Sequence, residues 1–327
     1  MAGSSISVNY NVRPCKSIER KMMCEMISRL NAFDQIENYR YIGMGAKYFA
    51  DFSLLHKEFG ITDMISMEIS SDENNKRRFE FNKPFNCINI KFGNASDILN
   101  STQLRWEGIK NIIWLDYDGG MRSNQFQDVE TCMAKVDTGS VIFISFNMDL
   151  GDAFNKGSPN EKLEIYCSRI DNNLLVELLT PKDLVKEKLF QTTNRMFDII
   201  IKNKISIRNK TILNEKERYQ CRQVAYFKYK DSQATMLTLG WIVYNNSDIE
   251  AFEKCRFSDL EFYNCTDQPY DITVPNFTYK ELSVLNKNMP NLSYPIKEAE
   301  FLHEHEVMAY HKIYKYYPTI FETSIVL

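Results

Sequence analysis

The chain has 327 residues, of which 44% are hydrophobic and 25% are charged. This composition is typical of a globular protein with a buried core, and it excludes general disorder. The formal net charge of −3 argues against a broadly basic surface that coats nucleic acid, although it leaves room for a local basic patch.

Neither a membrane segment nor a disulfide framework is expected. The longest apolar run is far shorter than the roughly 18 residues that indicate a membrane span, and the N-terminal residues contain no apolar signal core. The eight cysteines include no CxxC pair, so we expect reduced, mostly buried thiols. These features predict a cytoplasmic protein without a membrane partner.

The first predicted element is an N-terminal helical cap within residues 1–38. Apolar residues recur at helical spacing over residues 15–30. Arg13, Lys16, Arg20 and Lys21 give this helix a basic entrance. The basic residues indicate either a solvated helical face or a cap over a site that holds an anionic group.

Strand and helix patterns then alternate. The apolar runs are short and rich in Ile and Val, which is typical of parallel strands covered on both faces. Right-handed crossovers between such strands predict a doubly wound, mostly parallel α/β sheet. The predicted strands are 39–44, 64–69, 87–92, 111–116 and 140–146, and the predicted helices are 50–59, 72–82 and 126–136.

The pattern changes after Asp149. Residues 151–160 read as a polar loop and 161–204 as helical, with a new helix beginning at Pro181. Two strands follow, at 223–229 and 235–244, and the short polar link between them predicts an antiparallel β-hairpin. One domain is therefore expected over residues 39–249, with a helical insertion at about 151–220.

Residues 250–327 form a predicted C-terminal extension that is rich in aromatic residues and mainly helical, with helices at 277–287 and 297–316. Tyr310, Tyr314 and Tyr317 follow helical spacing, which favours packing against the core or a partner over stacking on nucleic-acid bases. His303 and His305 are expected on different sides of the second helix, as a solvated surface and not as zinc ligands.

Polar and glycine residues follow the predicted strands. Ile42-Gly43-Met44-Gly45-Ala46 ends the first strand, where glycines allow the backbone to approach a ligand. Glu68 ends the second strand and can accept hydrogen bonds from both hydroxyls of a ribose, the alternative being a surface carboxylate. The third strand ends in Gly93-Asn94-Ala95-Ser96-Asp97, where a short polar side chain can bond the amine of an adenine.

The fourth strand is strongly apolar and ends in Leu115-Asp116-Tyr117-Asp118-Gly119-Gly120. Acids and glycines at the carboxyl end of a central strand have little packing purpose, and ligands of open α/β sheets collect at this edge. We therefore interpret this strand end as the centre of a functional site.

This ordered set of strand ends, together with the closing hairpin, resembles the class I S-adenosylmethionine-dependent methyltransferases over about residues 39–245. It is most similar to bacterial proteins loosely described as O-methyltransferases. The resemblance implies a Rossmann-like fold and S-adenosylmethionine as cofactor. It assigns to the cofactor Ile42, Gly43, Met44, Gly45, Glu68, Asn94, Ala95, Asp97 and Asp116, and to catalysis Asp116, Tyr117 and Asp118.

Two departures from the family pattern limit the hypothesis. Tyr41 occupies the position of an acid that the family often carries before the first glycine, and Lys47 and Tyr48 follow Ala46 where a third glycine is usual. These departures leave open a catalytically weak or inactive subunit that binds the cofactor or a nucleotide as a sensor or scaffold. The absence of an Asn/Asp-Pro-Pro-aromatic motif after the fourth strand disfavours methylation of base amino groups and favours an oxygen acceptor.

The acceptor and any metal are less defined. Arg13, Lys16 and Arg20 are candidate contacts to an anionic acceptor, such as a nucleic acid or nucleotide. Asp116, Asn147 and Asp149 occupy positions suited to Mg²⁺ in some small-molecule O-methyltransferases, but a strand-ending turn explains the last two equally well, and we favour no metal. The C-terminal region is a candidate surface for a protein partner or a second copy of the chain.

Overall fold

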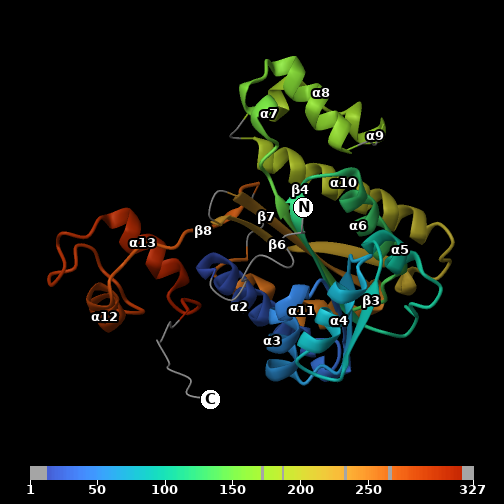
Figure 1. Ribbon diagram of the computed structural model, residues 1–327, viewed down its shortest axis with the longest axis horizontal. Helices are drawn as coiled ribbons and strands as arrows, with labels where there is room; N and C mark the ends of the chain where they lie inside the picture. Colours follow the sequence, from blue (N-terminus) through green and yellow to red (C-terminus); the bar gives the residue numbers. More distant parts are fainter. Residues whose placement is uncertain (1–12, 171–172, 186–187, 232–233, 264–266, 319–327) are drawn as a thin grey trace.

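The computed structural model describes residues 13–170, 173–185, 188–231, 234–263 and 267–318. Its described residues form one eight-stranded sheet in the order β3-β2-β1-β4-β5-β7-β6-β8, with helices on both faces (Figure 1). The predicted doubly wound α/β fold is therefore confirmed. The strands are β1 Arg40–Gly43, β2 Asp63–Glu68, β3 Ile88–Phe92, β4 Asn111–Gly120, β5 Ser140–Asn147, β6 Tyr219–Asp231, β7 Ala234–Asn245 and β8 Tyr270–Ile272.

Neighbouring strands are parallel from β3 to β5, and the hairpin strands β7 and β6 that follow are antiparallel. Strand β7 pairs antiparallel with both β5 and β6, which confirms the predicted hairpin, and β8 adds a short edge strand parallel to β6. The strand order reverses between β1 and β4, which lie side by side. A crevice forms beyond the carboxyl ends of the strands at such a reversal, and ligands bind there in open α/β sheets.

The helices divide between the two faces and a helical insertion. Helices α7 to α10 lie between β5 and β6 in the chain. The bounds are α2 Pro14–Ser28, α3 Ala50–Phe59, α4 Glu73–Asn82, α5 Ala95–Asn100, α6 Ser123–Lys135, α7 Asp152–Lys156, α8 Pro159–Ile170, α9 Asn173–Val176, α10 Leu189–Asn209, α11 Ile249–Lys254, α12 Tyr279–Lys287 and α13 Glu304–Ile313. Among the described helices, none is long and apolar enough to cross a bilayer.

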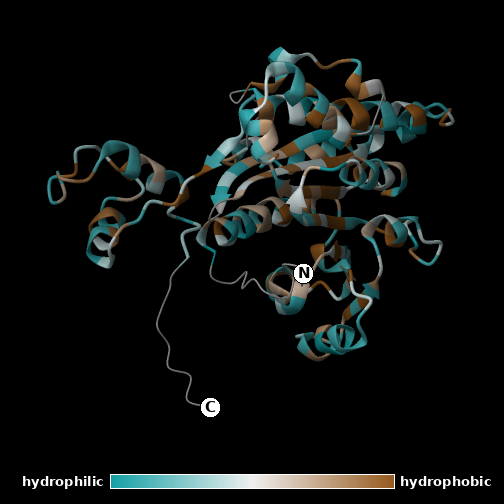
Figure 2. Ribbon diagram, turned by 45° about the horizontal axis from the view of Figure 1, so that its top comes forward, coloured by the Kyte–Doolittle hydropathy of each residue, from teal (hydrophilic) through white to brown (hydrophobic). Residues whose placement is uncertain are grey.

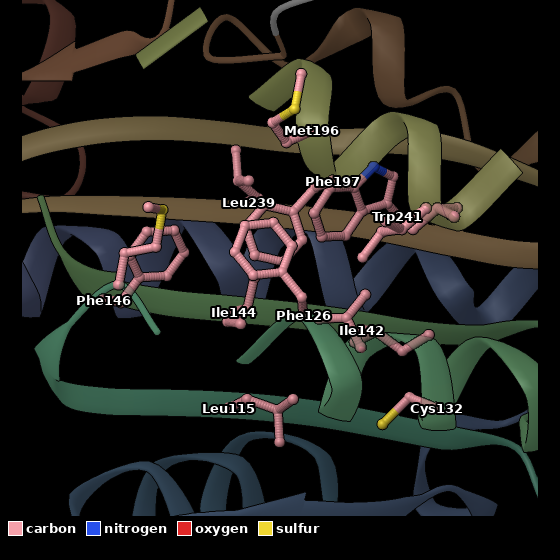
Figure 3. Packing of buried hydrophobic residues seen from close by; sticks show 14 of the residues in the cluster. Leu115, Phe126, Cys132, Ile142, Ile144, Phe146, Met196, Phe197, Leu239 and Trp241 are labelled. Carbon is pink, nitrogen blue, oxygen red and sulfur yellow. The ribbon is translucent and has the colours of Figure 1, made fainter. Parts of the chain in front are cut away.

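Each face of the sheet has its own hydrophobic core. On one face, Phe126 of α6 stacks on Phe197 of α10 with 4.2 Å between ring centroids, and Phe197 lies 5.9 Å from Trp241 of β7 (Figure 3). On the other face, α2 and α3 bury their apolar stripes, which include Met22 and Phe52. The hydrophobic colour of the central strands in Figure 2 reflects this burial on both faces.

Two predicted segments were wrong in detail. Residues 151–160 contain the short helix α7, whose Phe154 is buried. The helix predicted over 297–316 covers only Glu304–Ile313, because Ile296, Ala299 and Leu302 lie in two successive turns. Their spacing of three residues places them on one side of these turns as well as it would in a helix, so the sequence pattern did not separate the two structures.

The C-terminal extension has a small core of its own. Leu285 of α12 and Val307 and Tyr310 of α13 are buried in it, and Tyr317 packs on Tyr310 with 5.3 Å between ring centroids. The predicted packing role of these tyrosines is confirmed. Figure 1 shows α12 and α13 projecting beyond β8, away from the other helices.

The histidine prediction needs a correction. His303 is the N-cap of α13 and precedes its first turn, so its ring stacks beside that of His305 at 5.7 Å instead of pointing to a different side. Within the described ranges, no three His, Cys, Asp or Glu side chains are grouped to hold a metal ion. The described cysteines are all free thiols, as predicted, but the expectation that most are buried was wrong, because among them only Cys132 and Cys255 are buried.

Helix α2 is tied to the sheet by buried charges. Lys16 Nζ lies 2.8 Å from Asp116 Oδ1 of β4 and 2.9 Å from Glu19 Oε2, and it sits 4.3 Å above the Trp114 ring. Burial lowers the pKa of Lys16, but Asp116 and Glu19 more than offset this effect, so the net shift is upward and the ammonium is charged.

Further contacts neutralise the other buried charges of α2. Glu19 accepts hydrogen bonds from Tyr229 of β6, at 3.0 Å, and from Thr238 of β7. Arg20 forms an ion pair with Asp51 of α3. The interpretation of Lys16 and Arg20 as a solvated basic face is therefore wrong, because carboxylates from α3 and β4 lie directly against the helix.

Substitution Lys16→Ala should destabilise the protein by about 3–5 kcal/mol, because it leaves Glu19 and Asp116 buried without their cation. Denaturant unfolding measures this loss. The matched control is Lys156→Ala, which removes an exposed pair with Asp152 and should cost about 0–1 kcal/mol. Equal losses in the two variants would show that the buried charges do not anchor α2.

Candidate functional site

A cavity of about 770 Å³ opens at the carboxyl ends of β1 to β4, where the strand order reverses. Its size is in the range of small-molecule and cofactor sites. The lining residues come from every strand end singled out in the sequence and from the starts of α3 and α6. They are Arg20, Met44, Gly45, Ala46, Tyr48, Ala50, Asp51, Met67, Glu68, Ile69, Gly93, Asn94, Ala95, Ser96, Asp97, Asp116, Tyr117, Asp118 and Asn124.

The turn after β1 is fixed to the end of β2. Gly45 donates its backbone N–H to Ser66 Oγ at 3.1 Å, and Ser66 in turn donates to Glu68 Oε1 at 2.7 Å. A Cβ at Gly45 would lie 2.5 Å from Phe49 Cδ1 and 2.9 Å from Ser66 Oγ, so this close approach requires glycine. The turn therefore brings its backbone close to the end of β2 at the cavity wall.

Glu68 is the most buried carboxylate of the cavity wall, with 4% of its surface exposed. Burial raises its pKa to about 7, although hydrogen bonds from Ser66 and from the backbone of Gly45 and Ala46 act in the opposite direction. An oriented, buried carboxylate at the cavity wall is suited to accept hydrogen bonds from a ligand's hydroxyl groups.

The end of β3 supplies an amide and a further acid. Gly93 donates its N–H to the Glu68 carbonyl at 3.0 Å, which holds the ends of β3 and β2 together. Asn94 Nδ2 donates to Asp97 Oδ2 at 3.2 Å, and both side chains are exposed. This pair forms a polar rim on the β3 side of the cavity.

The end of β4 gives its three polar side chains different environments. Asp116 is held by Lys16, whereas Asp118 is exposed. Tyr117 donates its hydroxyl to the Asp128 carboxylate of α6, and burial raises the pKa of Tyr117 far above its ordinary value. The tyrosine hydroxyl is thus a neutral donor already in use, and Asp118 is the exposed carboxylate of this strand end.

The charges along the cavity are strongly unbalanced. Among the described lining residues, Arg20 is the one basic side chain, and it faces an excess of carboxylates. These carboxylates belong to Asp51, Glu68, Asp97, Asp116 and Asp118. Arg20 pairs with Asp51, and Lys16 behind the wall pairs with Asp116. The remaining carboxylates give the lining an excess of negative charge, which favours a cationic ligand over a phosphorylated one.

Most, but not all, of the predicted cofactor residues line this cavity. Ile42 does not, because it points into the core below the sheet, and Gly43 lies against the Tyr41 hydroxyl. Asp51 was missed by the sequence reasoning. Its signal was an acid in the first turn of the helix that follows the glycine turn, which by itself also fits a favourable helix N-terminus.

The predicted acceptor contacts fall in different places. Arg20 lines the cavity, and Lys16 lies behind Asp116. Arg13 is the N-cap of α2. Because Lys16 and Arg20 are neutralised by buried carboxylates, they do not present a basic surface to the phosphates of a nucleic acid.

The three residues considered for Mg²⁺ do not form a metal site. Asn147 Oδ1 accepts the N–H of Asp149, and Asp149 Oδ1 accepts that of Gly151, each at 2.9 Å, so both side chains stabilise the turn after β5. Asp116 is occupied by Lys16 and lines a different cavity from Asp149. This donor set does not fit an octahedral ion that needs convergent oxygen ligands.

Comparisons with known proteins were made for structure and for sequence. Similar solved structures include an O-methyltransferase from Klebsiella pneumoniae described as putative (11% identity, 72% of this chain and 81% of that chain, TM-score 0.36). They also include an O-methyltransferase from Bacillus cereus in complex with SAH (13% identity, 72% of this chain and 84% of that chain, TM-score 0.36). A further one is the plantazolicin methyltransferase BamL (15% identity, 70% of this chain and 85% of that chain, TM-score 0.35). No curated protein sequence matches the chain significantly.

The sequence profile of one protein family matches residues 8–325, which is nearly the whole chain. That span includes the parallel sheet, the helical insertion, the hairpin and the C-terminal extension. The chain belongs to the family described as "Putative O-methyltransferase".

Proposed function

We propose that this protein transfers a methyl group from S-adenosylmethionine to an oxygen atom of its acceptor. The observation that carries the proposal is the acidic cavity at the strand-order reversal, in which one arginine faces five carboxylates. S-adenosylmethionine is a nucleoside with a positively charged sulfonium, so it matches both the position and the charge of this cavity.

Different residues of the cavity fit different groups of the cofactor. Glu68 would accept the ribose hydroxyls, and the Asn94–Asp97 rim would lie beside the adenine. Asp51 and Asp116 would surround the cationic end. When bound, the cofactor supplies an electrophilic methyl group on sulfur.

The charge balance also separates this ligand from other nucleotides. Dinucleotides and nucleoside triphosphates bring phosphates, which such sites normally hold with helix N-termini, glycine-rich turns and basic side chains. Here the described wall has one basic side chain, and that arginine is already paired with Asp51. The charge therefore favours a methyltransferase cofactor over a nicotinamide dinucleotide or ATP.

The two aspartates at the end of β4 have separable roles in the proposed reaction. The acceptor oxygen attacks the methyl carbon in line, the C–O bond forms, the C–S bond breaks, and the acceptor's hydroxyl proton must leave. Asp118 is exposed and is the proposed proton acceptor, whereas Asp116, fixed by Lys16, orients the reactants. Tyr117 contributes its ring to the cavity wall.

An oxygen acceptor is favoured over an amine by the residues after β4. A carboxylate at this position accepts a hydroxyl proton, and the chain has no Asn/Asp-Pro-Pro-aromatic motif there. The inactive-scaffold alternative rested on Tyr41 in place of an acid and on the large aromatic C-terminal region. Since carboxylates of Asp51 and Asp116 line the cavity in place of an acid at that position, this departure does not favour a loss of activity.

Calorimetry should find that S-adenosylmethionine binds, whereas ATP and NAD⁺ do not bind at millimolar concentration. The reason is the repulsion between phosphates and the acidic wall. A variant with Asp51→Asn is expected to bind S-adenosylmethionine about tenfold more weakly because one carboxylate is lost from the cationic end. Binding of ATP in preference to S-adenosylmethionine would contradict the proposed function.

The affinity for S-adenosylmethionine should depend on the charge of Glu68. With a pKa of about 7, this carboxylate loses its charge as the pH falls, so the Kd is expected to rise about tenfold between pH 8 and pH 6. The matched variant Glu68→Gln cannot titrate and should bind weakly at both pH values. Titration calorimetry of the two proteins measures this difference. If the Kd of the variant depends on pH as strongly as that of the unmodified protein, Glu68 does not bind the cofactor.

Asp118→Asn is expected to lower kcat/KM by ~10²-fold or more for a phenol whose hydroxyl is protonated. The loss should be much smaller for 4-nitrophenol, which is largely ionised at pH 8 and needs no base. Release of S-adenosylhomocysteine is the readout, with the Kd for S-adenosylmethionine as the control for an intact cofactor site. Equal losses on the two phenols would show that Asp118 does not accept the proton.

A further inference from the structure

A second cavity, of about 930 Å³, lies on the other side of the first turn of α2. The insertion forms one wall of it, through α7, α8 and α10, and β6, β7 and β8 form the other. Its lining residues are Cys15, Met148, Asp149, Phe154, Asn155, Lys162, Leu184, Leu189, Phe190, Lys228, Tyr229, Lys230, Thr235, Asp271, Ile272, Thr273 and Val274.

The two cavities are separated by only a few side chains. Tyr229 belongs to the wall of the second cavity, and its hydroxyl donates to Glu19 Oε2 at 3.0 Å. The same oxygen lies 2.9 Å from Lys16 Nζ, which lies 2.8 Å from Asp116 in the wall of the first cavity. The buried side chains of Tyr229, Glu19 and Lys16 thus form a wall between the second cavity and Asp116.

The second cavity differs from the first in its charge. Three lysines line it against two aspartates. Lys228 pairs with Asp271 at 3.0 Å, while the Asp149 carboxylate is held by the turn after β5. In the described part of the chain, neither Lys162 nor Lys230 has a carboxylate partner, so the lining carries excess positive charge.

The rest of the lining is largely apolar and partly aromatic. Phe154 and Phe190 each lie beside a lysine, with Lys162 Nζ 5.8 Å from the Phe154 ring centre and Lys228 Nζ 5.7 Å from that of Phe190. Aliphatic side chains from β8 and from the insertion surround these rings. Such a lining buries a flat apolar group and holds an anionic substituent at its edge.

We infer that the second cavity is a separate binding site for an amphipathic small molecule with a planar apolar body and an anionic group. The inference goes beyond the proposed function, and the class of ligand follows from the lining. The opposite charges of the two cavities separate their ligands, because the cationic cofactor is attracted to one and the anionic molecule to the other.

A matched pair of fluorescent probes tests the ligand class. 8-Anilinonaphthalene-1-sulfonate and N-phenyl-1-naphthylamine share one ring system and differ by the sulfonate. The full chain should bind the sulfonate about tenfold more tightly than the neutral probe, since the lysines hold the anion. Saturating S-adenosylmethionine should leave this binding unchanged, because the two cavities share no lining residue.

Variants locate the bound probe. The double substitution Lys162→Met and Lys230→Met should weaken binding of the sulfonate about tenfold and change that of the neutral probe less than twofold. Thr235→Trp should abolish binding of both probes by filling the cavity. The control pair Lys280→Met and Lys287→Met removes the same charge from the exposed face of α12 and should have no effect. Thermal melts establish that each variant is folded.

Two results would overturn the inference. Displacement of the probe by S-adenosylmethionine would show that the probe binds in the first cavity. Equal affinity for the two probes would show that the second cavity does not select an anionic ligand. Failure of the proposed function has a different signature, namely no heat on titration with S-adenosylmethionine while the lysine-dependent probe binding persists. The two ideas are therefore tested separately.

Discussion

The arrangement of the molecule depends on a single buried ammonium group, that of Lys16. It joins Asp116 at the end of β4 to Glu19, which is bonded in turn to β6 and β7. An ion pair of this kind adds little net stability, because desolvation cancels much of the attraction. Its geometric effect is larger, since it fixes α2 across the carboxyl edge of the sheet and so separates one potential hollow into two cavities.

Charge then distinguishes these cavities although they share a wall. Five carboxylates surround the first, and an excess of lysines lines the second. Burial adds a further distinction within the first cavity. Glu68 is desolvated and its pKa approaches 7, whereas Asp118 stays in contact with water. Carboxylates thus serve different purposes according to the depth at which the fold holds them.

The sequence predicted the parts of this structure that depend on local pattern. Strand ends at Gly45, Glu68, Asn94 and Asp116 were identified because parallel strands bring their carboxyl ends to one edge. What escaped prediction depends on contacts between distant segments. Lys16 is buried against the carboxylate of Asp116 on β4, which the sequence of its own helix does not indicate. The second cavity is lined by segments as far apart in the sequence as residues 15 and 274.

The hydrogen bonds to Glu19 have a consequence for the order in which the protein is made. Glu19 precedes its partners Tyr229 and Thr238 by more than 200 residues, so it is translated well before them. During synthesis the N-terminal helix must therefore wait, with its carboxylate uncompensated, until the hairpin leaves the ribosome. Contacts of such long sequence separation form late and slowly, so the wall between the two cavities is among the last parts of the nascent protein to be completed.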